Sequence, residues 1–167
     1  LPGALFRFPM KKLLSALAFA GLMAFSACAH AQTPKNPEGP TDPLQIVSAG
    51  KTHAFKVELA DTPQESEMGL MYRASMPKDH GMIFEFRPMR DVSMWMKNCL
   101  FPQDMLFLDD DGTVLGIAEN ARPGSERLIT PGFPIASVLE LNGGIAKELG
   151  IKPGDKVKHK LFKNISG

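Results

Sequence analysis

The stretch 92–120, VSMWMKNCLFPQDMLFLDDDGTVLGIAEN, constrains the fold more than any other part of this chain. It holds three short apolar segments, 92–96, 104–108 and 114–118, each about as long as a strand. The last two are separated by DDDG, and its Asp-Gly pair is a strong signal for a hairpin turn. The stretch therefore predicts a sheet of short strands with polar residues at the strand ends.

Further strands and two short helices are predicted along the chain. The strands fall at 44–48, 53–60, 82–86, 137–141 and 156–162. The first helix begins after Thr62, because Pro63 and Glu65 complete a capping box, and it is expected to reach about Arg73. The second helix is short, from Ile145 to Leu149.

The pattern contains no internal repeat and no regular alternation of strand and helix. We therefore predict an α+β, mainly β fold: a compact antiparallel sheet curled into a small barrel-like fold with two short helices. A single domain over 44–162 would hold these elements, followed by a short tail over 163–167.

The first 31 residues have the character of an export signal. Met10, the expected true start, precedes two lysines and an apolar run over 13–25 that is too short to span a bilayer. Cleavage after Ala31 would release a periplasmic or extracellular protein. The alternative is a lipid on Cys28 that anchors the protein to a membrane. Residues 32–43 are rich in proline and polar residues, which predicts a flexible linker.

Charge and cysteine content exclude two classes of protein. The leader contains three of the 19 basic side chains and none of the 18 acidic ones, which leaves 16 basic against 18 acidic. No basic patch for nucleic acid is visible, so no nucleic-acid partner is expected. Without the leader, Cys99 is the only cysteine, and no intramolecular disulfide can form.

Several polar residues are predicted to meet at one rim of the sheet. If the strands 82–86, 92–96, 104–108 and 114–118 form a simple antiparallel meander, one rim collects Asp79, His80, Lys97, Asn98, Asp104, Glu119 and Asn120. The loop 121–136 leaves from the same rim and is long enough to cover it. Three interpretations stay open: a solvated rim, a binding pocket and a catalytic site.

Within this set, Trp95 and Lys97 are expected on the same face of their strand. The lysine would then either face a ligand or lie along the aromatic ring. Other motifs fail on spacing: DDDG does not fit a calcium loop, the histidines lack zinc spacing, and the methionines fall at core-facing positions rather than in a copper site. A nucleophilic Cys99 paired with His80 is less favoured than a small buried thiol. No metal and no cofactor is expected.

The chain resembles the family known as domain of unknown function 192. The resemblance is carried by MGLMYR at 68–73, DHGMIF at 79–84, MWMKN at 94–98, PQDMLF at 102–107, AEN at 118–120, VLEL at 138–141 and GIKPGD at 150–155. It implies a compact β-rich domain without an established activity. It also implies a shared motif formed by Arg73, His80, Lys97, Asn98, Asp104, Glu119 and Asn120. The family usually has threonine where this chain has Cys99, which argues against a cysteine nucleophile.

Three functions are compatible with these observations. The favoured one is an exported, non-enzymatic accessory domain that binds a small polar or anionic ligand, or an envelope protein, around His80, Lys97 and Asn120. The alternative is a hydrolase-type enzyme that uses His80 with Asp104 or Glu119 as acid and base. The third is a purely structural role.

Overall fold

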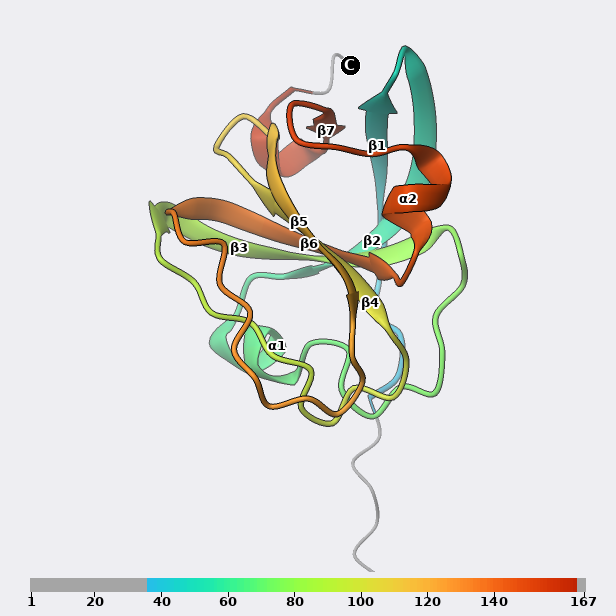
Figure 1. The fold of residues 1–167 in the computed structure, drawn as a ribbon, viewed down its shortest axis with the longest axis vertical. Helices are drawn as coiled ribbons and strands as arrows, with labels where there is room; N and C mark the ends of the chain where they lie inside the picture. Colours follow the sequence, from blue (N-terminus) through green and yellow to red (C-terminus); the bar gives the residue numbers. More distant parts are fainter. Residues whose placement is uncertain (1–35, 165–167) are drawn as a thin grey trace, which may run out of the picture. The chain divides into compact units, whose positions relative to one another are not determined.

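The computed structural model describes residues 36–164, which form a mainly β domain around one seven-stranded sheet (Figure 1). The sheet is curled into a half-barrel with the strand order β5-β4-β6-β3-β2-β1-β7. The elements are β1 (Asp42–Ser48), β2 (Lys51–Ala60), α1 (Pro63–Met68), β3 (His80–Arg90), β4 (Gln103–Leu108), β5 (Val114–Ala121), β6 (Ile135–Asn142), α2 (Ile145–Leu149), β7 (Lys156–Lys158) and the 3-10 turn η1 (Lys160–Phe162). The predicted mainly β class with two short α-helices is confirmed.

The central position of β6 overturns the predicted meander. β6 pairs antiparallel with both β3 and β4, so it lies between two strands that were expected to be close neighbours in a meander. β2 and β3 run parallel, with α1 in the connection between them, so the sheet is mixed rather than purely antiparallel. These pairings join strands far apart in sequence, which a local apolar pattern does not encode.

The predicted strand over 92–96 is wrong. These residues form a loop, and only Met94 makes a bridge, to Ile129 of the segment after β5. The loop looks like a strand in sequence because Met96 is buried in the core while Trp95 stays partly exposed. An apolar loop that packs onto a core has the same composition as a strand.

Most helix and strand limits follow local chemistry. The capping box of α1 forms as predicted, but α1 ends at Met68, not near Arg73, because Gly69 adopts a positive φ and closes the helix. α2 ends as predicted, against Gly150 in the left-handed region. The last strand is shorter than predicted, since η1 replaces its second half. No helix within residues 36–164 is long and apolar enough to cross a bilayer.

The predicted leader lies outside the described residues. Of the predicted linker, residues 36–41 precede β1, and the strand itself begins at Asp42, inside that segment. The Asn36 side-chain amide donates hydrogen bonds to the carbonyl oxygens of Gly69 and Met71, both at 2.8 Å. The start of the described chain is thus attached to the turn that follows α1.

Two apolar cores lie on the two faces of the sheet. One contains Ile46, Leu106 and Leu139 and is covered by α2. The other contains Met82, Met96 and Met105 and lies on the side of α1, so the two helices are on opposite sides of the sheet (Figure 1). We call the second the methionine-rich core. Its surface is formed by α1 and by the loops 91–102 and 122–134.

Candidate functional site

The seven residues of the predicted site occupy separate places in the fold. Arg73 lies in a buried ion pair, and His80 begins β3 beside Asp79. Lys97 and Asn98 line a groove next to α1. Asp104 and Asn120 meet below α2 through a hydrogen bond of 2.8 Å from the Asn120 amide. Glu119 is exposed at the end of β5, near the loop that follows it. The single rim expected from a meander is therefore absent.

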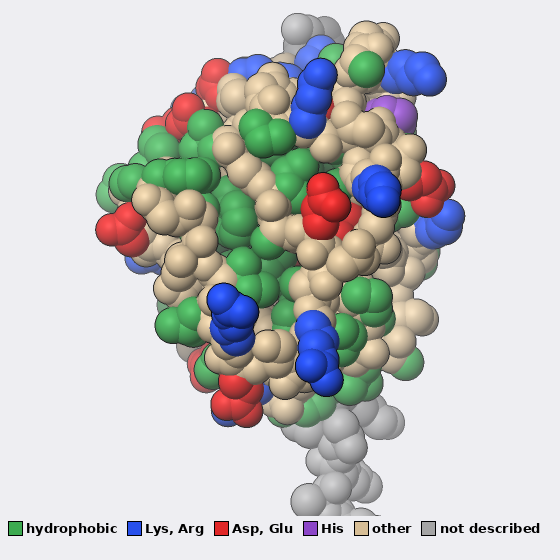
Figure 2. Space-filling view, viewed as in Figure 1, with side chains coloured by type: hydrophobic (Ala, Val, Ile, Leu, Met, Phe, Trp, Pro, Cys, Tyr) green, Lys and Arg blue, Asp and Glu red, His purple; other side chains and the backbone are tan. Residues whose placement is uncertain are grey.

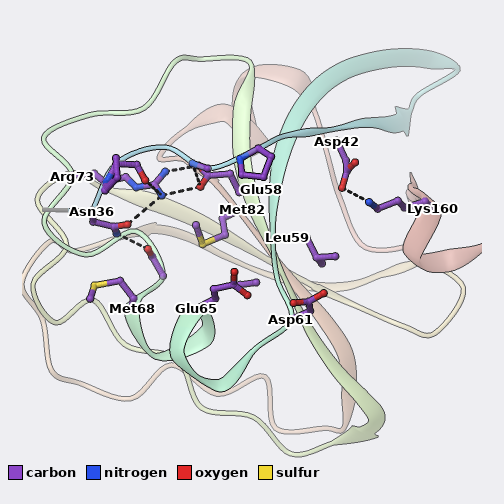
Figure 3. A pocket seen from close by; sticks show the side chains of 15 residues that line it. Asn36, Asp42, Glu58, Leu59, Asp61, Glu65, Met68, Arg73, Met82 and Lys160 are labelled. Carbon is purple, nitrogen blue, oxygen red and sulfur yellow. Dashed lines mark hydrogen bonds and ion pairs between the residues drawn. The ribbon is translucent and has the colours of Figure 1, made fainter.

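Arg73 closes one end of a cavity of about 490 Å³ (Figure 3). Its guanidinium pairs with both oxygens of Glu58, and it also donates to the Asn36 side chain and to the carbonyl oxygen of Pro37 at 3.2 Å. Burial would raise the pKa of Glu58, but Arg73 and the amide of Gly39 hold it below its usual value. The charges of Arg73 and Glu58 thus compensate each other. Through its hydrogen bonds to Asn36 and Pro37, Arg73 has the structural role of holding residues 36–39 in place.

Most of the other charges around this cavity are also engaged, while Asp61 lies exposed at its edge. Lys160 pairs with Asp42 at 2.6 Å, and Glu65 is held by Thr62 in the capping box of α1. Figure 3 shows these side chains around the space between β2 and α1. A cavity whose charges are already paired offers few free groups to a ligand, so we do not place the site here.

Asp104 stabilises the start of α2. It is fully buried, and its two carboxylate oxygens accept hydrogen bonds from the backbone amides of Asn120, Gly144 and Ala146 at 2.8 to 3.0 Å. Since Gly144 has no side chain to cap α2, Asp104 supplies the cap from β4. This role explains why an aspartate stands inside an otherwise apolar strand.

Replacing Asp104 with asparagine is expected to lower the free energy of unfolding by about 1–3 kcal/mol, because one carboxylate oxygen becomes a donor facing a backbone amide. Urea denaturation measures the loss, and hydrogen exchange at Ala146 should show that α2 opens first. The exposed Asp91, changed to asparagine, is the control and should leave both values unchanged. Equal stability of Asp104→Asn and the wild type would contradict the capping role.

His80 is not brought to the carboxylates of the alternative enzyme hypothesis. Gly81 of β3 and Asp104 of β4 both pair with Leu141 of β6. Positions 81 and 104 therefore face the same side of the sheet. His80, one residue earlier, points to the opposite face of the sheet. Its ring Nδ1 lies 2.9 Å from Asp79 Oδ1 instead.

An open groove of about 460 Å³ runs between α1 and the loop that contains Trp95. We call it the outer groove; it is lined by Gln64, Glu67, Met68, Met71, Tyr72, Trp95, Lys97 and Asn98. The ammonium of Lys97 lies 5.1 Å from the centre of the Trp95 ring. The prediction that these two side chains share a face is confirmed, although the segment is a loop.

Tyr72 and Asn98 hold the two sides of the outer groove together. The Tyr72 amide donates to the carbonyl oxygen of Asn98 at 2.8 Å, and the Asn98 side chain donates to the Tyr72 hydroxyl at 2.7 Å. Both residues have positive φ, 63° and 57°, which is unusual for a tyrosine. Such strained backbone persists only where surrounding contacts fix it, and it concentrates at binding sites.

A smaller space lies beneath the outer groove and shares Glu67, Met68, Met71 and Trp95 with it. This inner hollow has a volume of about 30 Å³ and is also lined by Met94, Cys99 and Glu140. Glu140 belongs to β6, where it pairs with Met82 on one side and Met105 on the other. Its carboxyl therefore lies at the centre of the methionine-rich core.

Glu140 is a buried acid without a charged partner. Its exposed fraction is 4%, and none of the ion pairs within residues 36–164 involves it. Burial raises the pKa of Glu140 to about 8. Burial, together with the charge of Glu140, raises the pKa of the neighbouring Cys99 to about 11, so the thiol stays protonated near neutral pH.

Glu140 was not predicted as a residue of the site. The sequence signal that could have identified it was a single acid in an otherwise apolar strand. An unpaired charge is costly inside a strand that pairs on both sides. Perturbed acids of this kind are enriched at functional sites.

Exposed apolar side chains also lie on the loop 122–134. The loop after β5 carries Leu128, which is 61% exposed, and Phe133, which is 36% exposed. Figure 2 shows hydrophobic side chains gathered across the middle of the face that this loop crosses in Figure 1, with lysine or arginine side chains below them. This face is thus more apolar than a surface that only meets solvent.

Comparisons with known proteins place the chain among uncharacterised relatives. A family model named DUF192, described as Uncharacterized ACR, COG1430, matches residues 44–159. A crystal structure from Sinorhizobium meliloti 1021, described as a candidate transcription regulator, is 47% identical, with a TM-score of 0.71 and coverage of 75% of this chain and 99% of that one. A crystal structure of a protein of unknown function from Novosphingobium aromaticivorans DSM 12444 is 40% identical, with a TM-score of 0.69 and coverage of 71% and 85%. No curated protein matches the chain.

Proposed function

This chain belongs to the DUF192 family, and from that premise we propose that it is a non-enzymatic accessory protein that binds a small anionic or polar ligand in the outer groove. One observation carries the proposal: Lys97 lies over Trp95 at the open groove. In the part of the chain that the structure describes, no carboxylate forms an ion pair with this ammonium. The positive charge is thus free to meet an anionic group of the ligand.

The rest of the outer groove supports the same ligand chemistry. Trp95, Met68 and Met71 offer an apolar surface, while Asn98 and Tyr72 offer hydrogen-bonding groups beside Lys97. A mostly apolar concave surface with a few fixed polar groups is the usual form of a small-molecule site. The proposed ligand is therefore a small molecule with one anionic group and an apolar part.

The separation of His80 from the carboxylates supports a non-enzymatic role. Both oxygens of Asp104 already accept backbone hydrogen bonds, and Glu119 lies exposed at the end of β5. Neither is arranged beside His80 as an acid and base pair would need to be. A nucleic-acid ligand is not proposed either, because the chain after the leader carries more acidic than basic side chains.

Export forms the second part of the proposal. The basic residues before the apolar run 13–25, and the small residues up to Ala31, support a periplasmic or extracellular protein. A lipid on Cys28, which would attach the domain to a membrane, is the alternative product. The mass of the mature protein distinguishes the two, since it gives either a chain that starts at Gln32 or a lipidated chain that starts at Cys28.

Native mass spectrometry of the protein purified from its own cells tests the binding proposal. We expect an additional mass that is lost on denaturation, and we expect Lys97→Ala to lose it because the anionic group no longer has a cation to pair with. Lys147→Ala, which removes an exposed cation from α2, is the matched control and should retain the additional mass.

Two results would contradict the proposal. One is an additional mass that Lys97→Ala retains in full. The other is a native mass equal to the denatured mass, which would favour a protein partner or a structural role over a small ligand. In that case, cross-linking in the cell envelope would be the next measurement.

A further inference from the structure

The methionines of the domain are concentrated on one side of the sheet. Residues 36–164 contain eight methionines, and seven of them belong to the methionine-rich core or its surface. Four are buried packing residues, as the sequence predicted: Met76, Met82, Met96 and Met105. The other three, Met68, Met71 and Met94, line the inner hollow, so core packing does not account for all of them.

The inner hollow combines residues that carry soft sulfur atoms with two acidic residues. Met68, Met71, Met94 and Cys99 line it. Glu67 of α1 and Glu140 of β6 line it as well, and Glu140 has an exposed fraction of 4%. A volume of about 30 Å³ suits a single ion or water molecule and is too small for an organic ligand.

The ligand atoms available in the inner hollow indicate which class of metal ion it could bind. Thioether and thiol sulfur prefers soft cations such as Cu(I), whereas Mg²⁺ and Ca²⁺ require several oxygen ligands. Zn²⁺ usually takes imidazole and thiolate ligands, and no histidine lines the inner hollow. The donor set therefore fits a soft monovalent ion better than any of the common divalent ones.

We propose that the inner hollow binds one soft monovalent cation, Cu(I) or its analogue Ag(I), through Met68, Met71, Met94 and Cys99, with Glu140 as the balancing anion. Thioethers are neutral, so the single positive charge of the ion needs one negative charge nearby. Carboxyl groups for this balance line the inner hollow, at Glu67 and Glu140, and no electron is transferred. The ion differs in chemistry from the ligand proposed for the outer groove, although the two spaces share Met68, Met71 and Trp95.

Trp95 makes the site directly observable. It is the only tryptophan of the chain and it lines the inner hollow, so its fluorescence reports binding there. Cys28→Ser, which removes the thiol of the leader, should leave the quenching of Trp95 emission unchanged. Titration of the full chain with Ag(I), which needs no reductant, is expected to quench Trp95 emission with a stoichiometry of about one ion per chain.

The double variant Met71→Leu/Met94→Leu tests the ligands, because leucine keeps the volume of methionine and removes the sulfur. Loss of an outer-shell partner alone costs a metal site 10- to 100-fold in affinity, so losing two direct ligands should weaken Ag(I) binding by at least about tenfold. The control is Met89→Leu, which lies outside the methionine-rich core and should titrate like the wild type. If the double variant does not fold, as circular dichroism would show, Met68→Leu at the more exposed side of the hollow replaces it.

Three results would overturn the proposal. The first is Trp95 emission that does not respond to Ag(I) in the wild type. The second is a methionine variant that binds Ag(I) as tightly as the wild type. The third is loss of binding in Cys99→Ser together with unchanged binding in the methionine variant, which would assign the ion to an isolated thiol.

Discussion

Replacing Glu140 with glutamine is expected to stabilise the metal-free domain, by an amount that grows with pH. Burial raises the pKa of Glu140 from 4.5 to about 8 in the folded state, so the folded protein holds this proton more tightly than the unfolded chain. The raised pKa of Glu140 therefore contributes fully to the free energy of unfolding below about pH 4.5. This contribution is lost as the pH rises to about 8. Glutamine has a similar shape and no charge, so the variant avoids the loss.

The linkage between pKa and stability sets the size of the effect. Between pH 5 and pH 9, the stability of Glu140→Gln should rise relative to the wild type by roughly 4 kcal/mol, at about 1.4 kcal/mol for each unit of pKa shift. Urea denaturation at several pH values measures this difference. Subtracting the free energy of unfolding of the wild type from that of the variant removes the contribution of His159, because its lowered pKa affects both proteins equally.

Glu148→Gln is the matched control for Glu140→Gln. Glu148 is exposed on α2 and contacts only Lys78 at the surface, so its removal should give no widening difference between pH 5 and pH 9. A constant difference between Glu140→Gln and the wild type across this range would contradict a raised pKa at the centre of β6.

Replacing Arg73 with methionine is expected to destabilise the domain by about 3–5 kcal/mol, because it leaves the buried carboxylate of Glu58 without its cation. The side chains of Arg73 and Glu58 are 5% and 11% exposed, so water cannot replace the lost contacts fully. The same change removes the hydrogen bonds from Arg73 to Asn36 and Pro37, so Asn36 keeps only its bonds to Gly69 and Met71. We therefore expect faster proteolysis before β1 as well as a lower midpoint in urea.

A second substitution distinguishes the ion pair from simple packing. In Glu58→Leu/Arg73→Met, no charge remains buried, so most of the lost stability should return. Lys78→Met serves as the control, because its exposed pair with Glu148 should contribute less than about 1 kcal/mol. If the double variant is no more stable than Arg73→Met, the shape of the arginine, and not its charge, holds this corner of the fold.

The local elements of the fold could be predicted from the sequence, but their pairing could not. Thr62, Pro63 and Glu65 specify the start of α1 through neighbours in the chain, and Gly150 ends α2 in the same way. The insertion of β6 between β3 and β4 depends on contacts between distant residues, and no short motif encodes it. The loop around Met94 was mistaken for a strand because its partner, Ile129, lies 35 positions later in the chain.

The candidate site was predicted in part for the same reason. Lys97 and Trp95 are two residues apart, so their shared face follows from local geometry whether the segment is a strand or a loop. Glu140 lies about 40 residues further along, and only the sheet topology brings it beneath Trp95. Asp104 was predicted as a residue of the rim, whereas its carboxylate caps α2, a helix that begins 41 positions later.

The late position of β6 in the chain has a consequence for how the protein folds. Until residues 135–142 are available, β3 and β4 each lack the strand that joins them, so the first part of the chain cannot complete the sheet. Pairings between distant segments slow folding, because a long loop must close before they form. A nascent chain of this topology cannot complete its sheet until β6 has been synthesised, and the export that we propose would need a chain that has not yet completed its fold.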